Sequence, residues 1–358
     1  SVWEISADHQ LSVSIAGKSR SFAAKRILLA TGAQERPVPF PGWTLPGVMT
    51  CGSAQILLKS SGLTPAAPLV LAGSGPLLLL IACQLLRAGV EIEAVLDTTP
   101  KENLVPAIKH LGGALRGWRY LLKGMGLLAE LKKAGVRYLK NVSQLSAVAG
   151  EDGRIARVQF SCRNHVESLN CATLLVHQGV VPNVQLGRAM GLEHQWHELQ
   201  QCWRPVTDNW GESGNRSGVF IAGDCSCIGG ASAAEQAGSL TALEIARQLR
   251  KISREQRDQL AAPLQREQSR QLAIRPFLDA LYRPAPAFLN PADETTVCRC
   301  AEVSAGDIRT FARSGCRGPN QAKAFGRSGM GPCQGRLCGL TVSRIIADEH
   351  GIPIDEVG

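Results

Sequence analysis

The segment PLVLAGSGPLLLLIACQLLRAGVEIEAVLD, residues 68–97, limits the folds open to this chain more than any other. A short apolar run ends at Gly73 and Gly75, an apolar segment of helical length follows, and a second apolar run ends at Asp97. Two parallel strands need a crossover helix of this kind, so the segment predicts one βαβ unit. The glycines would allow a tight turn beneath a pyrophosphate, and Asp97 stands where a carboxylate accepts hydrogen bonds from ribose hydroxyls.

One position in this unit departs from the dinucleotide-binding pattern, because Leu78 replaces its third glycine. A branched side chain there would crowd the contact between strand and helix or push a ligand away. Two interpretations stay open. The unit either binds a nicotinamide dinucleotide, with Asp97 favouring NAD over NADP, or is retained for its fold alone.

Two further apolar runs end in small residues. LLATGA carries Thr31 and Gly32, and VFIAGDCSCIGG carries Gly223 and Asp224 ahead of a long helical segment. Each strand end would let a bulky cofactor approach the backbone, and Asp224 would accept a hydrogen bond from a ribityl hydroxyl or a water beside phosphate-binding amides. Either pattern alone is a common turn; their order around an inserted βαβ unit is much more specific.

These segments also carry a resemblance. Residues 27–50 (ILLATGAQERPVPFPGWTLPGVMT), residues 174–183 (LLVHQGVVPN) and the Gly223–Asp224 turn resemble flavoproteins with two dinucleotide-binding domains. They are similar to the alpha-type subunit of heteromeric amino-acid and opine dehydrogenases. That group includes the A-type chain of opine oxidase, the B-type chain of hydrogen cyanide synthase and the hydroxyproline dehydrogenase alpha subunit. The resemblance covers nearly the whole chain and implies FAD contacts at Thr31, Gly32, Gly223 and Asp224.

An α/β organisation in five segments follows. We predict an FAD-binding domain over 1–64 and 179–250, an inserted NAD(P)-type Rossmann-like domain over 65–178, a helical and proline-rich linker over 251–291, and a cysteine module over 292–358. An FAD-binding domain normally opens with its own strand, Gly-rich turn and helix. Because the chain opens in a strand meander instead, we expect that about a hundred residues are absent from its N-terminus.

The cysteine module contains Cys298, Cys300, Cys333 and Cys338 in the pattern C-x-C…C-x4-C. Four thiolates from two loops bind either zinc or an iron–sulfur cluster. The glycines of SGMGPCQGRLCG would leave backbone N–H groups free to point at sulfur, which favours a [2Fe–2S] cluster over zinc and over unligated thiols. The segment is similar to the bacterioferritin-associated ferredoxin-like (BFD-like) [2Fe–2S] module, including its RGPNQAKAF stretch.

Composition excludes several classes of protein. The net charge of +9 comes from bases spread along the chain, with few aromatic residues between them, so we expect no nucleic-acid partner. No uncharged apolar run is long enough for a transmembrane segment. The twelve cysteines are scattered along the chain, which is typical of a reducing compartment. We expect a cytoplasmic location, with peripheral attachment to the inner membrane as the other arrangement.

Catalytic residues stay unassigned, because none of the seven histidines has a Cys or Ser partner at a catalytic spacing. The resemblance implies a subunit that relays electrons from oxidation of a C–N bond in an amino acid, imino acid or opine. An FAD-containing beta subunit would oxidise that substrate, and flavin chemistry needs no strong protein base. Two alternatives stay open: an NAD(P)H-dependent flavin and iron–sulfur reductase, and a non-catalytic zinc-stabilised binding module.

Overall fold

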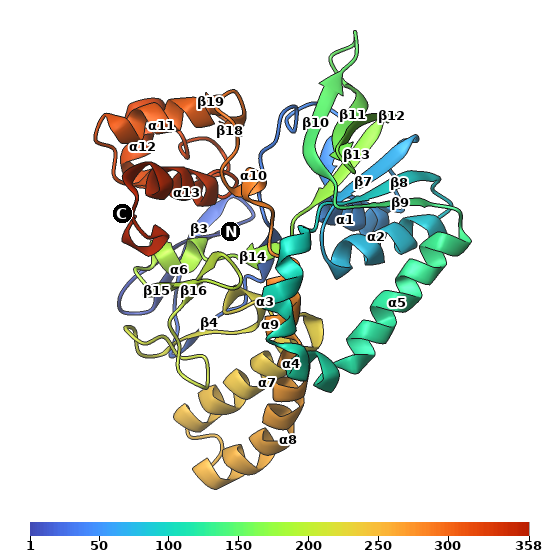
Figure 1. Ribbon diagram of the computed structural model, residues 1–358. Coiled ribbons are helices and arrows are strands. Elements are labelled where there is room, and N and C mark those ends of the chain that lie inside the picture. Colours follow the sequence, from blue (N-terminus) through green and yellow to red (C-terminus); the bar gives the residue numbers. More distant parts are fainter. Residues whose placement is uncertain (358) are drawn as a thin grey trace. The chain divides into compact units, whose positions relative to one another are not determined.

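A computed structural model describes residues 1–357 (Figure 1). The chain forms two compact units, each built from separate stretches of sequence. Unit 1 comprises Ser1–Gln34, Leu115–Gly117 and Val180–Arg275, and unit 2 comprises Glu35–Ala114, Trp118–Gly179 and the chain from Pro276 onward. The five predicted segments remain predictions, because these units are defined by contacts within the structure and not by domain limits.

Unit 1 begins with the predicted strand meander, an antiparallel sheet in the order β1-β2-β3. A second pair, β4 and β17, is parallel and brings together two strands that are far apart in sequence. The elements of unit 1 are β1 (Val2–Ile5), β2 (Gln10–Ile15), β3 (Lys18–Ala23), β4 (Ile27–Leu29), β14 (Val180–Pro182), α6 (Gln185–Ala189), β15 (His194–His197), β16 (Cys202–Pro205), β17 (Val219–Ile221), the 3₁₀ turn η2 (Gly223–Cys225), α7 (Ala231–Gln248) and α8 (Arg254–Leu272).

Unit 2 contains a parallel sheet in the order β6-β13-β7-β8-β9 and an antiparallel sheet in the order β10-β11-β12. Its strands are β6 (Val48–Thr50), β7 (Leu69–Gly73), β8 (Ile92–Asp97), β9 (Arg137–Lys140), β10 (Ser143–Ala149), β11 (Ile155–Cys162), β12 (His165–Asn170), β13 (Thr173–His177), β18 (Thr296–Cys298) and β19 (Val303–Ser304). Its helices are α1 (Cys51–Ser61), α2 (Pro76–Arg87), η1 (Lys101–Asn103), α3 (Leu104–Ile108), α5 (Trp118–Lys133), α10 (Pro286–Leu289), α11 (Ala305–Arg313), α12 (Pro319–Gly326), α13 (Gly339–His350) and η3 (Ile354–Glu356).

Three short elements fall on the boundaries between the two units, namely β5 (Ala33–Glu35), α4 (Leu111–Arg116) and α9 (Arg275–Leu281).

The βαβ unit predicted from residues 68–97 is confirmed as β7, α2 and β8. All of β7 is buried, and successive residues alternate between two cores because side chains point to opposite faces of a strand. Val70 and Ala72 pack into the core on one face, while Leu69 and Leu71 pack into the core on the face that α2 covers. Burial on both faces explains why this strand is a continuous apolar run.

The parallel sheet has a reversal in strand order between β13 and β7. From β7 the chain crosses to β8 on one side, and β13 is added later on the other side. The register places the last residues of three strands in a row, with His177 beside Gly73 and Gly73 beside Asp97. A crevice at this kind of reversal is the usual ligand position in open α/β sheets.

The C-terminal part of unit 2 is a small helical arrangement, in which α11 packs on α13 and α12. A capping box between Ser304 and Asp307 begins α11, and Arg327 in the left-handed conformation ends α12. This ending directs the chain into the glycine-rich loop that carries Cys333, while β18 carries Cys298. Among residues 1–357, no helix combines the length and apolar composition required to cross a bilayer.

Candidate cofactor sites

The first candidate site lies in unit 1, where β4 and β17 end beside each other. The hydroxyl of Thr31 donates to the carbonyl oxygen of Asn183 at 3.0 Å, and the N–H of Asn183 donates to the carbonyl oxygen of Gly32 at 3.0 Å. Gly32 has a φ of +66°, and a methyl group on it would meet no atom within 4 Å. The turn after β4 is therefore held in place from one side and open at Gly32.

The turn after β17 leads into α7. The carboxylate Oδ1 of Asp224 accepts hydrogen bonds from the N–H groups of Gly229 at 2.9 Å and Gly230 at 3.2 Å. Gly230 has a φ of +91° and precedes α7, and no side chain caps the first turn of that helix. An uncapped helix N-terminus with unpaired N–H groups and a positive dipole end favours a negatively charged group such as a phosphate.

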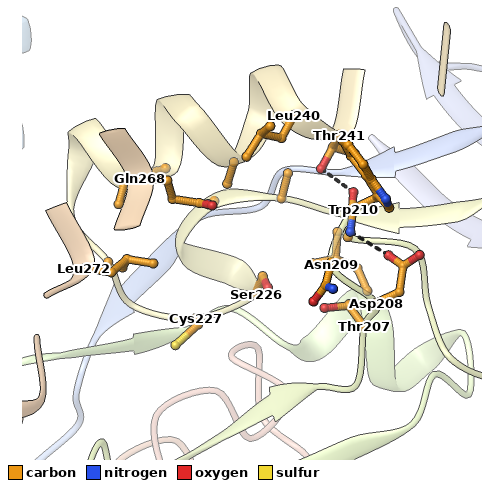
Figure 2. A pocket seen from close by; sticks show the side chains of 18 residues that line it. Thr207, Asp208, Asn209, Trp210, Ser226, Cys227, Leu240, Thr241, Gln268 and Leu272 are labelled. Atoms are coloured by element: carbon orange, nitrogen blue, oxygen red, sulfur yellow. Dashed lines mark hydrogen bonds between the residues drawn. The ribbon is translucent and has the colours of Figure 1, made fainter. Parts of the chain in front are cut away.

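A cavity of about 160 Å³ lies next to this turn (Figure 2). The side chain of Thr241 donates to the carbonyl oxygen of Trp210 at 2.8 Å, and the N–H of Trp210 donates to Asp208 at 2.8 Å, which fixes one wall. The cavity is lined by Thr207, Asp208, Asn209, Trp210, Gly211, Ile221, Ala222, Gly223, Ser226, Cys227, Gly229, Ala233, Ala234, Ala237, Leu240, Thr241, Gln268 and Leu272. Its volume is below the roughly 300 Å³ of a typical ligand pocket, so it suits part of a cofactor.

These features fit a flavin nucleotide. Gly32 and Gly230 are open positions with positive φ, and α7 presents an uncapped N-terminus. Gly223 has a φ of +81° and lines the cavity. Of the predicted FAD residues, Asp224 plays the most definite part, because its carboxylate orders the two amides ahead of α7. A direct contact between Asp224 and a ribityl hydroxyl remains a prediction.

A buried ion pair holds the other half of α7. The Glu244 carboxylate accepts hydrogen bonds from Arg247 at 2.5 and 2.9 Å and from Arg257 of α8 at 2.5 Å. The hydrogen bond from Arg247 has the largest effect on the pKa of Glu244. Together these bonds outweigh burial, which raises that pKa, and they lower it to about 2. The Arg257 guanidinium also stacks 4.0 Å from the ring centroid of Trp210, so the ion pair supports a wall of the cavity.

The second candidate site is the glycine turn after β7. A methyl group on Gly73 would lie 1.8 Å from the carbonyl oxygen of His177, so this glycine is required by the neighbouring strand. Gly75 begins α2 without a side-chain cap, but the ring of Tyr282 lies 3.8 Å from the position of a methyl group there. Leu78 is buried in the core beneath α2. The space above the turn is thus bordered by the protein's own side chains.

Asp97 is engaged in internal hydrogen bonds as well. One carboxylate oxygen accepts the N–H of Thr99 at 3.0 Å, and the other accepts the hydroxyl of Tyr138 at 2.7 Å. Burial, and then the charge of Asp97, raise the pKa of Tyr138 above its ordinary value. These contacts fit the fold-only interpretation of the βαβ unit better than a nicotinamide site, and binding of NAD at Gly73, Gly75 and Asp97 remains a prediction.

Sequence reasoning missed Glu35, the last residue of β5, which contacts the parallel sheet at His177. The ring of buried His177 lies 2.7 Å from one Glu35 carboxylate oxygen, and the N–H of Gly52 in α1 donates to the other at 2.7 Å. Burial, then the charge of Glu35, raise the pKa of the Cys51 thiol well above its ordinary value. Glu35 and His177 are 142 positions apart, so no local pattern could have paired them.

The third candidate site holds the four predicted metal-binding cysteines in unit 2. The sulfur atoms of Cys300 and Cys333 lie 3.9 Å apart. Two thiolates on one tetrahedral metal, at the usual metal–sulfur distance, would be about 3.8 Å apart. Burial raises the pKa of the Cys338 thiol, and the nearby thiols of Cys298, Cys333 and Cys300 raise it further. The two loops therefore bring the four thiols into one neighbourhood.

Two features of the surrounding loops act on these thiols. A methyl group on Gly331 would lie 2.2 Å from Cβ of Cys300, so only glycine allows this approach. Burial raises the pKa of Cys333, but backbone N–H groups of Leu337 and Gly335, the Cys300 thiol and Arg336 together outweigh it and lower that pKa.

Two orphaned hydroxyls accompany the thiols. Within residues 1–357, Thr295 and Ser328 carry buried hydroxyl oxygens without a hydrogen-bond partner, one in each cysteine-bearing segment. Across the same part of the chain, no three His, Cys, Asp or Glu side chains converge closely enough to define a metal site by themselves. The donor set fits a thiolate-bound metal or cluster, and its identity remains a prediction.

Comparison with known proteins adds the family. Residues 1–240 match the family model described as pyridine nucleotide-disulphide oxidoreductase. The chain is 44% identical to the A-type chain of opine oxidase from Rhizobium meliloti (strain 1021) over 336 residues, covering 93% of this chain and 72% of that protein. It is 34% identical to the HcnB chain of hydrogen cyanide synthase from Pseudomonas aeruginosa over 329 residues, covering 87% of this chain and 68% of that protein.

A solved structure resembles the whole chain. It is that of L-proline dehydrogenase from P. horikoshii, with a TM-score of 0.67 and 17% sequence identity, covering 100% of this chain and 60% of that one. At this identity the likeness shows the fold alone. The chain spans between 65% and 72% of the length of three opine oxidase chains of the A type that it matches.

Proposed function

The chain belongs to the pyridine nucleotide-disulphide oxidoreductase family and, within it, groups with the A-type chains of opine oxidases, and from this premise we propose its role. Membership identifies it as an FAD-dependent oxidoreductase. We propose that it is the electron-relay subunit of a hetero-oligomer that oxidises a C–N bond in an amino acid, imino acid or opine. The FAD-containing companion subunit oxidises the substrate, and this chain passes the electrons to an acceptor.

The observation that carries this proposal is the 3.9 Å approach of the Cys300 and Cys333 sulfurs, in a chain that also contains the open turn at Gly32. FAD and a [2Fe–2S] cluster, when bound, would supply the electron-transfer chemistry. The residues of the chain hold and tune these groups. Asp224 orders the amides before α7, and Gly32 leaves space for a ligand.

Around the thiols, the residues of the chain do three things. The N–H groups of Leu337 and Gly335 stabilise negative charge on Cys333, and Gly331 lets Cys300 approach. Cys298 and Cys338 are buried, which excludes water from one side of the site. Exclusion of water lowers the local dielectric constant and so affects the reduction potential of a bound cluster.

The proposal places the chain in a reducing, cytoplasmic compartment. Within residues 1–357 none of the twelve cysteines is in a disulfide, and most of them are buried. Buried free thiols behave as small apolar side chains, so this usage fits a cell interior better than a secreted disulfide framework. Cys225 and Cys227, which the sequence places in the flavin turn, are such thiols: Cys225 is buried and Cys227 half-buried.

Anaerobic purification with an absorbance spectrum, iron and sulfide analysis and flavin quantification tests the proposal. We expect about two irons per chain together with flavin absorbance. Cys300→Ser should remove the iron, while the matched variant Cys227→Ser should retain it, because Cys227 lies in the flavin turn of unit 1. One zinc per chain and no visible colour would overturn the relay and favour a zinc-stabilised module.

A further inference from the structure

A seven-residue repeat, separate from the cofactor sites, occupies the segment between β8 and β9. Residues 108–114, 115–121 and 122–128 read IKHLGGA, LRGWRYL and LKGMGLL. In each copy the first residue is a large aliphatic, the second is a base and the fourth is a large apolar residue. Apolar residues at alternating spacings of three and four, flanked by charges, are typical of a helix that packs along a partner helix. The turn near His110 and Gly117 divide the segment, so on one helix the pattern runs only through Trp118, Leu122 and Met125 of α5.

The two faces of α5 have different surroundings in the structure. One face packs against α2 through Leu127 and Leu131, both buried. Arg87 of α2 adds two hydrogen bonds to Glu130, at 2.8 and 2.6 Å. This face is therefore fixed to unit 2, and α5 does not depend on another partner for its position.

The opposite face of α5 carries an uncovered apolar stripe. Trp118, Leu122 and Met125 are 52%, 51% and 57% exposed. With about 100° between successive residues of a helix, they lie within about 60° of one another and nearly opposite Leu127 and Leu131. We call these three residues the α5 stripe. A monomeric protein rarely leaves such aligned apolar side chains in water unless they mark an interaction site.

The charges next to the stripe indicate what covers it. The helix contains four bases, Arg119, Lys123, Lys132 and Lys133, and its one acid, Glu130, is already paired with Arg87. A second copy of the same helix would bring bases against bases, which is repulsive. An acidic surface is complementary, and it would also be attracted over a longer range.

The width of the stripe favours a helix of another protein over a lipid bilayer as the group that covers it. An interfacial helix on a bilayer buries a broad apolar face, whereas a stripe confined to spacings of three and four residues is the narrower seam of helix–helix packing. On one side of the stripe lie Arg119, Lys123 and Gly126, and on the other lie Leu121 and Leu128, which are partly buried, so the exposed apolar band stays narrow.

We propose that the α5 stripe is the docking surface for an acid-flanked amphipathic helix of the companion subunit. This inference rests on the proposed function, since it assumes that a companion subunit exists. Trp118, Leu122 and Met125 insert into the apolar seam of that helix, and Arg119 and Lys123 pair with its flanking carboxylates. The aromatic anchor Trp118 is of the residue type that contributes most to interface affinity.

The test uses the complete assembly purified through a tag on this chain, from which the companion subunit is separated and titrated back. Leu122→Glu should raise the Kd for the companion at least about tenfold, because a carboxylate would be buried against apolar and acidic groups. Val166→Glu is the matched control: Val166 is 76% exposed on β12, and the Kd should stay within about twofold.

Further variants guard against loss of folding. Met125→Glu should reproduce the effect, and circular dichroism should show that both variants keep the helix content of the parent. Arg119→Glu with Lys123→Glu should slow association several-fold and reduce its dependence on salt, because the two charges steer the encounter.

Three outcomes overturn the docking inference. One is an unchanged Kd in both glutamate variants. Another is self-association of the chain that Leu122→Glu abolishes while companion binding stays intact. The third is binding to phosphatidylglycerol vesicles that Leu122→Glu abolishes while companion binding stays intact. If no second flavin-containing polypeptide is present and the chain oxidises substrate alone, the proposed function fails instead.

Discussion

The glycine turns after β7 and after β17 have similar sequence patterns but different surroundings in the structure. Both follow a buried strand, both precede a helix without a side-chain cap, and both have a carboxylate nearby. At the first turn, Gly73 fits against the backbone of His177 and Asp97 is bonded to Tyr138. At the second, Asp224 orders backbone amides beside a cavity.

The difference shows that a glycine pattern predicts where other atoms approach the backbone closely. It does not predict whether those atoms belong to another strand or to a ligand. At the β7 turn the close neighbour is another strand of the sheet. At the β17 turn the space is left for something outside the chain. Variants that treat the two turns alike should therefore give unlike results, and the following four range from the largest expected effect to the smallest.

Gly73→Ala should have the largest effect. The added methyl group would lie 1.8 Å from the carbonyl oxygen of His177, so β7 and β13 cannot stay paired as they are. We expect the free energy of unfolding to fall by at least about 4 kcal/mol, measured by chemical denaturation. The control Gly126→Ala, in α5 with no atom within 4 Å, should raise it by about 0.5–1 kcal/mol. Equal stabilities would show that the strands do not pack as described.

Lowering the pH should destabilise the packing of α7 and should have much less effect on α2. The folded-state pKa of Glu244 lies near 2, below its ordinary 4.5, so its carboxylate stabilises the fold fully above about pH 4.5. That contribution, about 3 kcal/mol, should be lost as the pH falls from 4.5 to 2. Denaturation at a series of pH values measures it.

Glu244→Gln should flatten this pH dependence, at the cost of lower stability at pH 7, because buried Arg257 loses one of its two carboxylate partners and keeps only Asp258. Glu235→Gln, on an exposed position of α7, should leave the dependence in place. A parent protein whose stability does not change between pH 5 and pH 3 would contradict the assignment.

Asp97→Ala distinguishes a residue that stabilises the fold from one that binds a nicotinamide dinucleotide. The hydroxyl of half-buried Tyr138 would lose its charged acceptor, so we expect a loss of about 1–3 kcal/mol in the free energy of unfolding. The Kd for NADH, measured by fluorescence titration, should stay within about twofold of the parent value. Tyr138→Phe should cost less than Asp97→Ala, and a tenfold weaker Kd in Asp97→Ala would restore the nicotinamide interpretation.

Asp224→Ala should show the reverse pattern at the other turn. The amides of Gly229 and Gly230 would lose their acceptor, and we expect FAD to bind about tenfold more weakly, or about 1.4 kcal/mol. Flavin absorbance per chain after gel filtration at a series of dilutions measures this. Asp224→Asn keeps an oxygen acceptor and should bind FAD nearly as well as the parent. Identical flavin retention in all three proteins would remove Asp224 from the site.

The parts of the fold that the sequence predicted are those with short-range signals. The run from Leu69 to Asp97 encodes strand, turn, helix and strand through neighbouring residues alone, and the structure has them at the expected positions.

The parts that escaped prediction depend on distant pairings. Nothing near Gly75 in sequence indicates that Tyr282 covers it, and nothing near His177 indicates Glu35. Among the cysteines, spacing indicated four candidate ligands but not the approach of Cys300 to Cys333, which depends on Gly331. Such contacts are set by how the elements pack, so they appear only with the three-dimensional structure.

The closeness of Cys300 and Cys333 has a consequence for the history of each molecule. Cys300 is the exposed member of the four, and a second thiol waits 3.9 Å from it. If the four thiols hold the proposed cluster, an oxidant that reaches Cys300 before the metal binds would join the two sulfurs in a disulfide and remove two of the four proposed ligands. Binding of the metal and oxidation of the thiols would then compete in every newly made chain.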